Sequence, residues 1–365
     1  KPGLDERVDH HRRPTARLLH RAAAHAAHGE TQVRDVDRAA VDPHARVGVE
    51  VDVEVYRYDP ANNGAAPLWC MGSTSLVRTG GELFASGIET IPNVKPLHNV
   101  RWMLFRRAAN GWELVRKDEQ GRTREPCPLL GFPNGRLFLS ANPTLTAPDT
   151  YDGPAQPQLL QFAAADPQAV PKTMLPQWSE AVTLNEHSYR NLAADGENRE
   201  LILFQNLGWD RAYWSFLDRE GNWSAQGKLL WPWGADYEEP QAIRLCYCNI
   251  QLRKRAVYVW GSSDIVEPVK AWKDFKFKLT DRQWDYDFRR LFFSWTPDIT
   301  REPFRPWIEV ASREMTAGHM QNCDLWVAPD GLVHLLWRER SLDERLRPTF
   351  FPDEKLTHGV HYAAL

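Results

Sequence analysis

Apolar and polar residues alternate over short stretches along most of this chain, with the period expected of half-buried β-strands. Pairs of these stretches are joined by residues that favour tight turns, such as Asn-Gly and Asp-Gly. Five such predicted hairpins turn at Gly80-Gly81, Asn134-Gly135, Asp195-Gly196, Arg253-Lys254 and Asp330-Gly331. The turn centres lie about 54, 61, 58 and 77 residues apart, and we interpret residues 265–287 as an insertion that lengthens the last interval.

Further predicted hairpins lie between these five. One turns at Asn110-Gly111, another turns at Glu220-Gly221, and two more begin at residues 159–162 and 291–295. Two hairpins per period make four strands, and a regular period of four-stranded units is typical of a β-propeller, in which sheets stack face to face around an axis. The sequence therefore predicts an all-β fold, a β-propeller with five visible inner hairpins and a total of five to seven blades. A β-sandwich would explain the strands but not their spacing.

The first 46 residues differ from the rest of the chain. Six of the 12 histidines lie within the first 50 residues, and no aromatic residue precedes Tyr56. A segment without aromatic residues buries little surface, so we expect residues 1–46 to be a low-complexity segment that is disordered or arises from a mis-called start. The propeller domain is predicted to span residues 47–365. Its first strand is expected where valine alternates with acidic residues, at Val49, Val51, Val53 and Val55.

Composition and charge narrow the classes of partner. The 16 tryptophans, 22 glycines and 26 prolines favour many short strands. The formal net charge is −3 and the basic residues are dispersed, so we predict no nucleic acid and no membrane surface as partner. No apolar run is long enough to span a bilayer, and no signal peptide is recognisable. A monomer in an extracellular or periplasmic location is the expectation.

Sequence motifs for common cofactors and metals are absent. The chain has no P-loop, no GxGxxG, no GxSxG and no HExxH, and its five cysteines lack zinc-type spacing. We therefore predict no cofactor and no metal site, although the sequence neither demands nor rules out a structural Ca²⁺. The cysteines are interpreted as small buried residues.

Candidate functional residues are those at or just before the inner strands, because the pockets of a propeller form at one mouth of its central channel. His187, Tyr189 and Arg190 form the most compact group: a His and a Tyr can serve as base and acid, and an Arg can neutralise a carboxylate. The alternative is a strand-edge cluster that satisfies local hydrogen bonds. A candidate catalytic carboxylate is Asp324, and the remaining candidates for substrate contact are His98, Arg101, Arg244, Tyr247, Trp284 and Asp285.

Trp284 and Asp285 belong to the predicted insertion. Alternating aromatic and acidic residues there would suit a loop that folds over a sugar ring. The alternative, which we favour, is a structural ion pair between Asp285 or Asp287 and the arginines at 289 and 290, with packed aromatic rings.

Taken together, the repeats and the Arg-, His- and Tyr-containing mouth resemble the sialidase-like, BNR-repeat-type β-propellers of carbohydrate-active enzymes. The resemblance covers roughly residues 66–340 and rests on the blade pattern and on segments such as residues 324–334. The Asp box of sialidases, SxDxGxTW, is missing, and residues 218–223 match it only loosely. The resemblance implies a poly- or oligosaccharide substrate with a uronate or sialate-like sugar. It also implies a tyrosine nucleophile and an arginine triad, for which Arg101, Arg190 and Arg244 are candidates.

Three functional hypotheses follow from this resemblance. Propeller polysaccharide lyases of the ulvan-cleaving kind rely on His, Tyr and Arg, which is similar to His187, Tyr189 and Arg190. A lyase needs a base beside a neutralised carboxylate, whereas a typical glycoside hydrolase needs two carboxylates that flank the bond. We expect an enzyme of one of these two kinds, and the competing class is a non-catalytic propeller that binds glycans or a protein.

Overall fold

The computed structural model describes residues 53–365, except residues 186 and 188. The segment 1–46 and the first two valines of the expected alternation therefore lie outside the described residues. Val53 and Val55 are described, and they do not form a strand, so this part of the prediction is wrong. Val55 instead packs with Tyr56 against one face of the first sheet, where the Tyr56 ring stacks on Phe105 at 5.1 Å.

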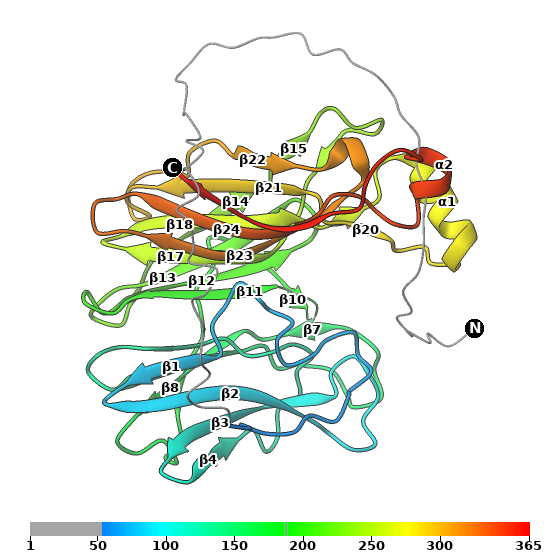
Figure 1. Ribbon diagram of the computed structural model, residues 1–365. Helices are drawn as coiled ribbons and strands as arrows, with labels where there is room; N and C mark the ends of the chain where they lie inside the picture. Colours follow the sequence, from blue (N-terminus) through cyan, green and yellow to red (C-terminus); the bar gives the residue numbers. More distant parts are fainter. Residues whose placement is uncertain (1–52, 186, 188) are drawn as a thin grey trace, which may run out of the picture.

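Five antiparallel sheets of three or four strands follow one another along the chain, and we call them blades 1 to 5 (Figure 1). Blade 1 contains β1 (Leu76–Thr79), β2 (Glu82–Thr90), β3 (Val100–Ala108) and β4 (Gly111–Lys117). Blade 2 contains β5 (Leu129–Gly131), β6 (Arg136–Ala141), β8 (Gln158–Ala163) and β9 (Lys172–Met174). Blade 3 contains β11 (Arg190–Asp195), β12 (Glu200–Leu207), β13 (Arg211–Leu217) and β14 (Trp223–Leu230). Blade 4 contains β17 (Leu245–Arg253), β18 (Ala256–Ser263), β21 (Arg290–Thr296) and β22 (Ile308–Ser312).

Blade 5 has three strands in the described part of the chain: β23 (His319–Val327), β24 (Val333–Arg340) and β25 (His358–Ala364). Three small two-stranded sheets pair β7 (Pro154–Ala155) with β10 (Leu184–Asn185), β15 (Trp233–Gly234) with β16 (Gln241–Ala242), and β19 (Ile265–Val266) with β20 (Tyr286–Asp287). The predicted insertion forms α1 (Lys270–Thr280), whose aromatic side chains pack on those of α2 (Arg347–Phe350). A short 3-10 helix, η1 (Glu314–Thr316), precedes blade 5. No helix of the described residues is long and apolar enough to cross a membrane.

Hydrophobic clusters between successive blades form the core. Adjacent residues of one strand point to opposite faces of their sheet, so Leu137 packs toward blade 1 whereas Phe138 packs toward blade 3. In the same way Val259 packs toward blade 3 and Trp260 toward blade 5. Blades 2, 3 and 4 thus bury both faces of their sheets, which confirms the predicted propeller of stacked sheets. Among the described residues, no such cluster joins blade 5 to blade 1.

The first strands of the blades, β1, β5, β11, β17 and β23, surround a central cavity of about 440 Å³. Neighbouring inner strands belong to different sheets, and asparagine side chains link them instead of backbone pairs. The Asn191 amide donates to the carbonyl of Cys248, which joins β11 to β17. The Asn322 amide donates to the carbonyl of Tyr247 at 2.6 Å, which joins β23 to β17. Both β17 and β23 contain a register shift at this level.

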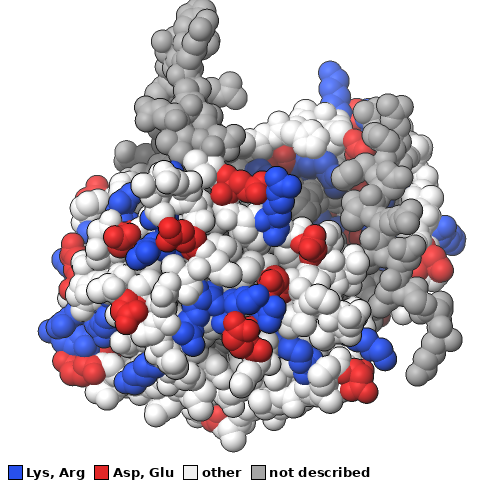
Figure 2. Space-filling view, turned by 90° about the horizontal axis from the view of Figure 1, so that it is seen from below, with Lys and Arg blue, Asp and Glu red and all other residues white. Residues whose placement is uncertain are grey.

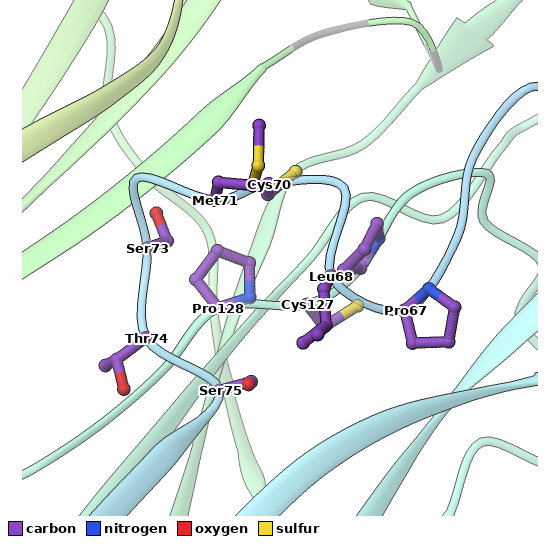
Figure 3. A pocket seen from close by; sticks show the side chains of 10 residues that line it. Pro67, Leu68, Cys70, Met71, Ser73, Thr74, Ser75, Cys127 and Pro128 are labelled. Carbon is purple, nitrogen blue, oxygen red and sulfur yellow. The ribbon is translucent and has the colours of Figure 1, made fainter. Parts of the chain in front are cut away.

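Residues 66–74, which we call the axial loop, precede β1 and lie against the inner strand of blade 4. A Cβ atom at Gly72 would lie 2.1 Å from the carbonyl oxygen of Cys248, so only glycine fits at this position. The loop also borders a cavity of about 230 Å³ that Cys127 and Pro128 line from the other side (Figure 3). The axial loop is therefore held in place at Gly72 by blade 4, although Leu68 and Met71 are exposed.

Charged side chains are mixed on the outside of the molecule. On the face shown in Figure 2, basic and acidic side chains are interspersed rather than gathered into one patch. This agrees with the dispersed basic residues of the sequence.

Replacing Trp260 by alanine should destabilise the protein strongly. Trp260 is fully buried between blades 4 and 5, where its ring lies 6.1 Å from that of Trp337. We expect Trp260→Ala to lower the free energy of unfolding by about 3–5 kcal/mol, measured by urea denaturation. The matched control is Trp233→Ala, whose side chain is 63% exposed and should change stability by about 0.5 kcal/mol or less. Equal losses in both variants would contradict the stacked-blade core.

Candidate active site

The residues that precede the inner strands meet at one end of the ring, on the right-hand side of Figure 1. There Trp69 of the axial loop packs edge-on against Tyr189 and Tyr247, with ring centroids 5.8 and 5.9 Å apart. The rings of Tyr189 and Tyr247 lie 5.0 Å apart, and His187 lies 5.9 Å from Trp69. We call these four residues the mouth cluster. The structure thus brings three of the predicted site residues together.

A buried carboxylate lies behind Tyr189. Arg244 donates from Nη2 to the Asp264 carboxylate at 2.5 Å and from Nε to the Asp264 carbonyl at 3.1 Å. The Tyr189 side chain lies close enough to the same carboxylate for the two groups to influence each other's pKa. Burial raises the pKa of Asp264, and Arg244 and Tyr189 only partly oppose this effect. Burial and the negative charge of Asp264 raise the pKa of Tyr189 well above 10, so Tyr189 is a neutral phenol at neutral pH with an acceptor for its proton beside it.

Arg244 is enclosed by aromatic rings. Its guanidinium carbon lies 4.0 Å from the centroid of Trp209, 5.4 Å from that of Tyr189 and 5.8 Å from that of Tyr286. The rings of Trp209 and Tyr286 are nearly parallel. Cation–π contacts of this kind hold a guanidinium in place when it is shielded from water. Arg244 therefore fixes the position of Asp264.

A second charged group lies on the blade 2 side of the mouth cluster. The side chains of Glu125 and Arg190 are fully buried, with Arg190 Nη1 3.5 Å from Glu125 Oε2. Glu125 Oε1 is 3.9 Å from Nδ1 of His187, and Arg124 also contacts this nitrogen. Arg124 lies over the Trp69 ring at 5.3 Å. His187 has 33% of its side chain exposed and Arg124 is partly exposed, so solvent reaches both of these polar side chains.

Two predicted substrate-contacting residues lie on blade 1, away from the mouth cluster. Arg101 on β3 forms an ion pair with Glu89 of β2 at 2.5 Å. His98 is fully buried in the loop before β3, where burial and the charge of Arg122 lower its pKa to about 4. Neither residue contacts Tyr189.

Asp324 lies further down the ring. It sits at the register shift of β23 and lines the central cavity, and its carboxylate accepts a hydrogen bond from the backbone of Leu325 at 2.8 Å. It is five residues beyond His319, where β23 begins, so it lies on the order of 15 Å along the strand from the mouth. The structure does not bring Asp324 together with Tyr189.

Trp284 and Asp285 precede β20. Trp284 is largely exposed, whereas Asp285 accepts a hydrogen bond from Arg345 at 3.0 Å. Asp287 lies 3.4 Å from Arg289, as in the ion-pair interpretation that the sequence favoured. Asp285 is therefore engaged in a structural network beside α1.

Arg124, Glu125 and Trp209 were missed by the sequence analysis. Arg124 and Glu125 lie five and four residues before β5, in the segment that leads into an inner strand, as His187 lies three residues before β11. The rule that selected Tyr189 would have found them had it been applied to blade 2. Trp209 lies in the turn between β12 and β13, and no sequence signal marks it as a neighbour of Arg244. In the described part of the chain, no group of three or more His, Cys, Asp or Glu residues is arranged to hold a metal ion.

Comparisons with known proteins give matches among solved structures only; no family model and no curated protein matches the chain. An α-L-arabinanase from Penicillium chrysogenum is 13% identical, with 78% of this chain and 79% of that chain covered and a TM-score of 0.43. An α-L-arabinofuranosidase from Fusarium graminearum is 9% identical, with 80% and 91% covered and a TM-score of 0.41. A Trypanosoma rangeli sialidase is 9% identical, with 72% and 43% covered and a TM-score of 0.40. At this level of similarity the function has to be argued from the residues of this chain.

The stability of the protein should depend on the protonation of Asp287. The pKa of this carboxyl is raised to about 8. Burial and the neighbouring carboxylates of Glu314 and Glu267 raise it, and together they exceed the opposing effect of Arg289. Between the ordinary pKa of 3.8 and about 8, the native state binds more protons than the unfolded state, so stability falls as pH rises through this range. We expect Asp287→Asn to gain stability relative to the wild type between pH 5 and pH 8, measured by urea denaturation at each pH.

The control for this measurement is Asp298→Asn. Hydrogen bonds from Thr300 lower the pKa of Asp298 below 3.8, so its contribution should stay constant between pH 5 and pH 8. If both variants showed the same pH dependence relative to the wild type, the effect would not belong to Asp287.

Proposed function

We propose that the protein is a carbohydrate-active enzyme that hydrolyses a glycosidic bond at the mouth cluster, in a glycan that carries an acidic sugar. The observation that carries this proposal is the buried Asp264 carboxylate beside Tyr189, which Arg244 holds in place through a hydrogen bond of 2.5 Å. A tyrosine with an adjacent base is one of the activated nucleophiles of covalent catalysis, and some glycosidases use it in place of a carboxylate.

Each side chain has a role in the proposed reaction. The Tyr189 oxygen attacks the anomeric carbon while its proton passes to Asp264, and the bond to the leaving oxygen breaks as His187 donates a proton to it. Water then cleaves the glycosyl–Tyr189 bond: His187 takes a proton from the water, and Asp264 returns the proton to Tyr189. Burial raises the pKa of Asp264, which makes it a stronger base for the first step.

Arg124 supports the proposal of an acidic sugar. Its Nε donates to the carbonyl of Asn63 at 2.9 Å, and it makes no ion pair with a carboxylate of the described residues. Its guanidinium is partly exposed above Trp69, beside His187. A substrate carboxylate can form charge-assisted hydrogen bonds with such a group, while the indole ring offers a flat apolar surface to the sugar.

Access to Tyr189 depends on Trp69. Tyr189 is only 7% exposed, and Trp69 packs against it from the axial loop. A sugar can reach the Tyr189 oxygen only after the indole moves aside. Binding of substrate and displacement of Trp69 are therefore one event in this proposal.

Substitution of Tyr189 tests the proposal. Tyr189→Phe keeps the ring but removes the nucleophilic oxygen, so kcat should fall about a thousandfold or more on whichever glycan of an acidic polysaccharide panel responds. The measurement is the release of reducing ends. Tyr258→Phe is the matched control, because Tyr258 stacks on Trp295 within blade 4. Unchanged turnover by Tyr189→Phe would exclude this mechanism, and no turnover of any glycan by the wild type would favour a binding propeller.

One observation favours a second candidate, a polysaccharide lyase. His187 is the solvent-accessible titratable group of the mouth cluster, and it lies beside Arg124. In a β-elimination, His187 would take the proton from C5 of a uronate whose carboxylate Arg124 neutralises. The C4–oxygen bond would break to leave a carbon–carbon double bond, and the protonated His187 would give that proton to the leaving oxygen. An increase in ultraviolet absorbance that parallels product formation would establish elimination. Hydrolysis would release reducing ends without a change in absorbance.

A further inference from the structure

Blade 5 carries a row of basic side chains on the face that points away from blade 4. The strand register places His319, Arg340 and His358 side by side across β23, β24 and β25. Arg338 lies two residues before Arg340 on the same strand, so it projects from the same face about 7 Å away. His319, Arg338, Arg340, His358 and Val360 line a groove of about 710 Å³.

The two arginines of this groove are unpaired. Among the described residues, neither Arg338 nor Arg340 has a carboxylate partner, and Nε of Arg340 is buried without a hydrogen-bond partner. Glu339 borders the groove, but its carboxylate is engaged by Arg313 and lies 3.1 Å from His361. Buried polar groups are normally hydrogen-bonded, and Nε of Arg340 is such a group, whereas Arg338 is exposed at the edge of the groove.

Positive charge in the groove comes from Arg338 and Arg340 of β24. Burial and the charges of Arg340 and Arg338 lower the pKa of His319 to about 4. His319 is thus neutral at pH 7 and can donate a hydrogen bond from its ring, while the arginines supply the charge. Arginine forks of this kind match the geometry of carboxylate, sulfate and phosphate groups.

The groove adjoins the mouth cluster. β23 begins and β24 ends at the mouth end of the ring, so the row of His319, Arg340 and His358 lies at that end. The His319 ring is 5.5 Å from Phe288, and Phe288 packs against the group of Trp69, Tyr189 and Tyr247. A chain that passes over Phe288 would lead from one site to the other.

The geometry points to an oxyanion-binding subsite in the blade 5 groove, formed by Arg338 and Arg340, which holds a carboxylate or sulfate on a sugar unit away from the cleaved bond. The residues of the groove support the binding of an oxyanion. The assignment of that oxyanion to a glycan rests on the function proposed above. The substrate class is then a glycan with acidic groups on more than one unit, rather than one with a single terminal acidic sugar.

Binding measurements with the full chain test this subsite. The probes are a polygalacturonate hexasaccharide, its carboxyl-reduced counterpart and inorganic sulfate, titrated by calorimetry. Arg338→Gln/Arg340→Gln should weaken binding of the charged hexasaccharide about tenfold or more and leave binding of the reduced one unchanged. Arg199→Gln/Arg219→Gln removes the same charge from turns at the opposite end of blade 3 and should have no such effect. Arg338→Gln alone, at an exposed position, should weaken binding of the charged hexasaccharide about threefold. This single variant serves as the test if the double variant fails to fold.

The outcomes separate this inference from the proposed function. Equal weakening by both double variants, or by neither, would overturn the subsite. Sulfate that binds as tightly as the charged hexasaccharide would show a site for free anions and overturn the glycan assignment. If Tyr189→Phe leaves turnover unchanged while Arg338→Gln/Arg340→Gln loses binding, the subsite stands and the catalytic proposal fails; the reverse pattern removes the subsite and keeps the catalytic proposal.

Discussion

The inner strands of adjacent blades are held together by side-chain amides. Each of these strands faces a neighbour that belongs to another sheet, so buried carbonyls near the axis would lack donors without Asn191 and Asn322. A buried carbonyl left without a donor costs about 1–3 kcal/mol. Asn191 lies two residues after Tyr189, and the carbonyls that accept these bonds belong to Cys248 and to Tyr247 itself. The bonds that join blades 3, 4 and 5 therefore also set the distance between the two tyrosines of the mouth.

Two ion pairs are buried at the mouth, and their contribution to stability does not by itself explain why they are there. The Arg244–Asp264 pair and the Arg190–Glu125 pair are both almost completely shielded from water. Such pairs give little net stability because both ions lose their hydration, although removal of one partner costs about 3–5 kcal/mol. Their more specific effect is on position: one pair fixes the Asp264 carboxylate beside Tyr189, and the other fixes the Glu125 carboxylate near His187.

The fold was predictable because local signals agreed with one another. The turns at Gly80-Gly81 and Asn134-Gly135, with their regular spacing, marked the inner hairpins where the structure has them. The absence of a strand at Val53 and Val55 was not predictable, since alternation says which residues are half-buried but not whether a strand edge is available for pairing. The candidate site was only partly predictable. Tyr189 and Asp264 meet from blades 3 and 4, and Asp285 is bound by an arginine sixty residues away in the sequence. Contacts between residues so far apart in the sequence leave no pattern in the sequence around either residue.

Gly72 fits closely against blade 4, and this contact divides the axial loop into two parts that differ in their tolerance of amino-acid substitutions. From Cys70 to Ser73 the backbone is wedged between strands, and almost any larger residue at Gly72 would collide with a carbonyl oxygen. Ahead of this wedge, Leu68 is exposed and Trp69 covers the tyrosines. A library that varies residues 66–69 while it keeps 70–74 constant would alter the lining of the mouth on an unchanged scaffold. Substitutions at these four positions would therefore change the surface of the mouth without a change in the inner strands.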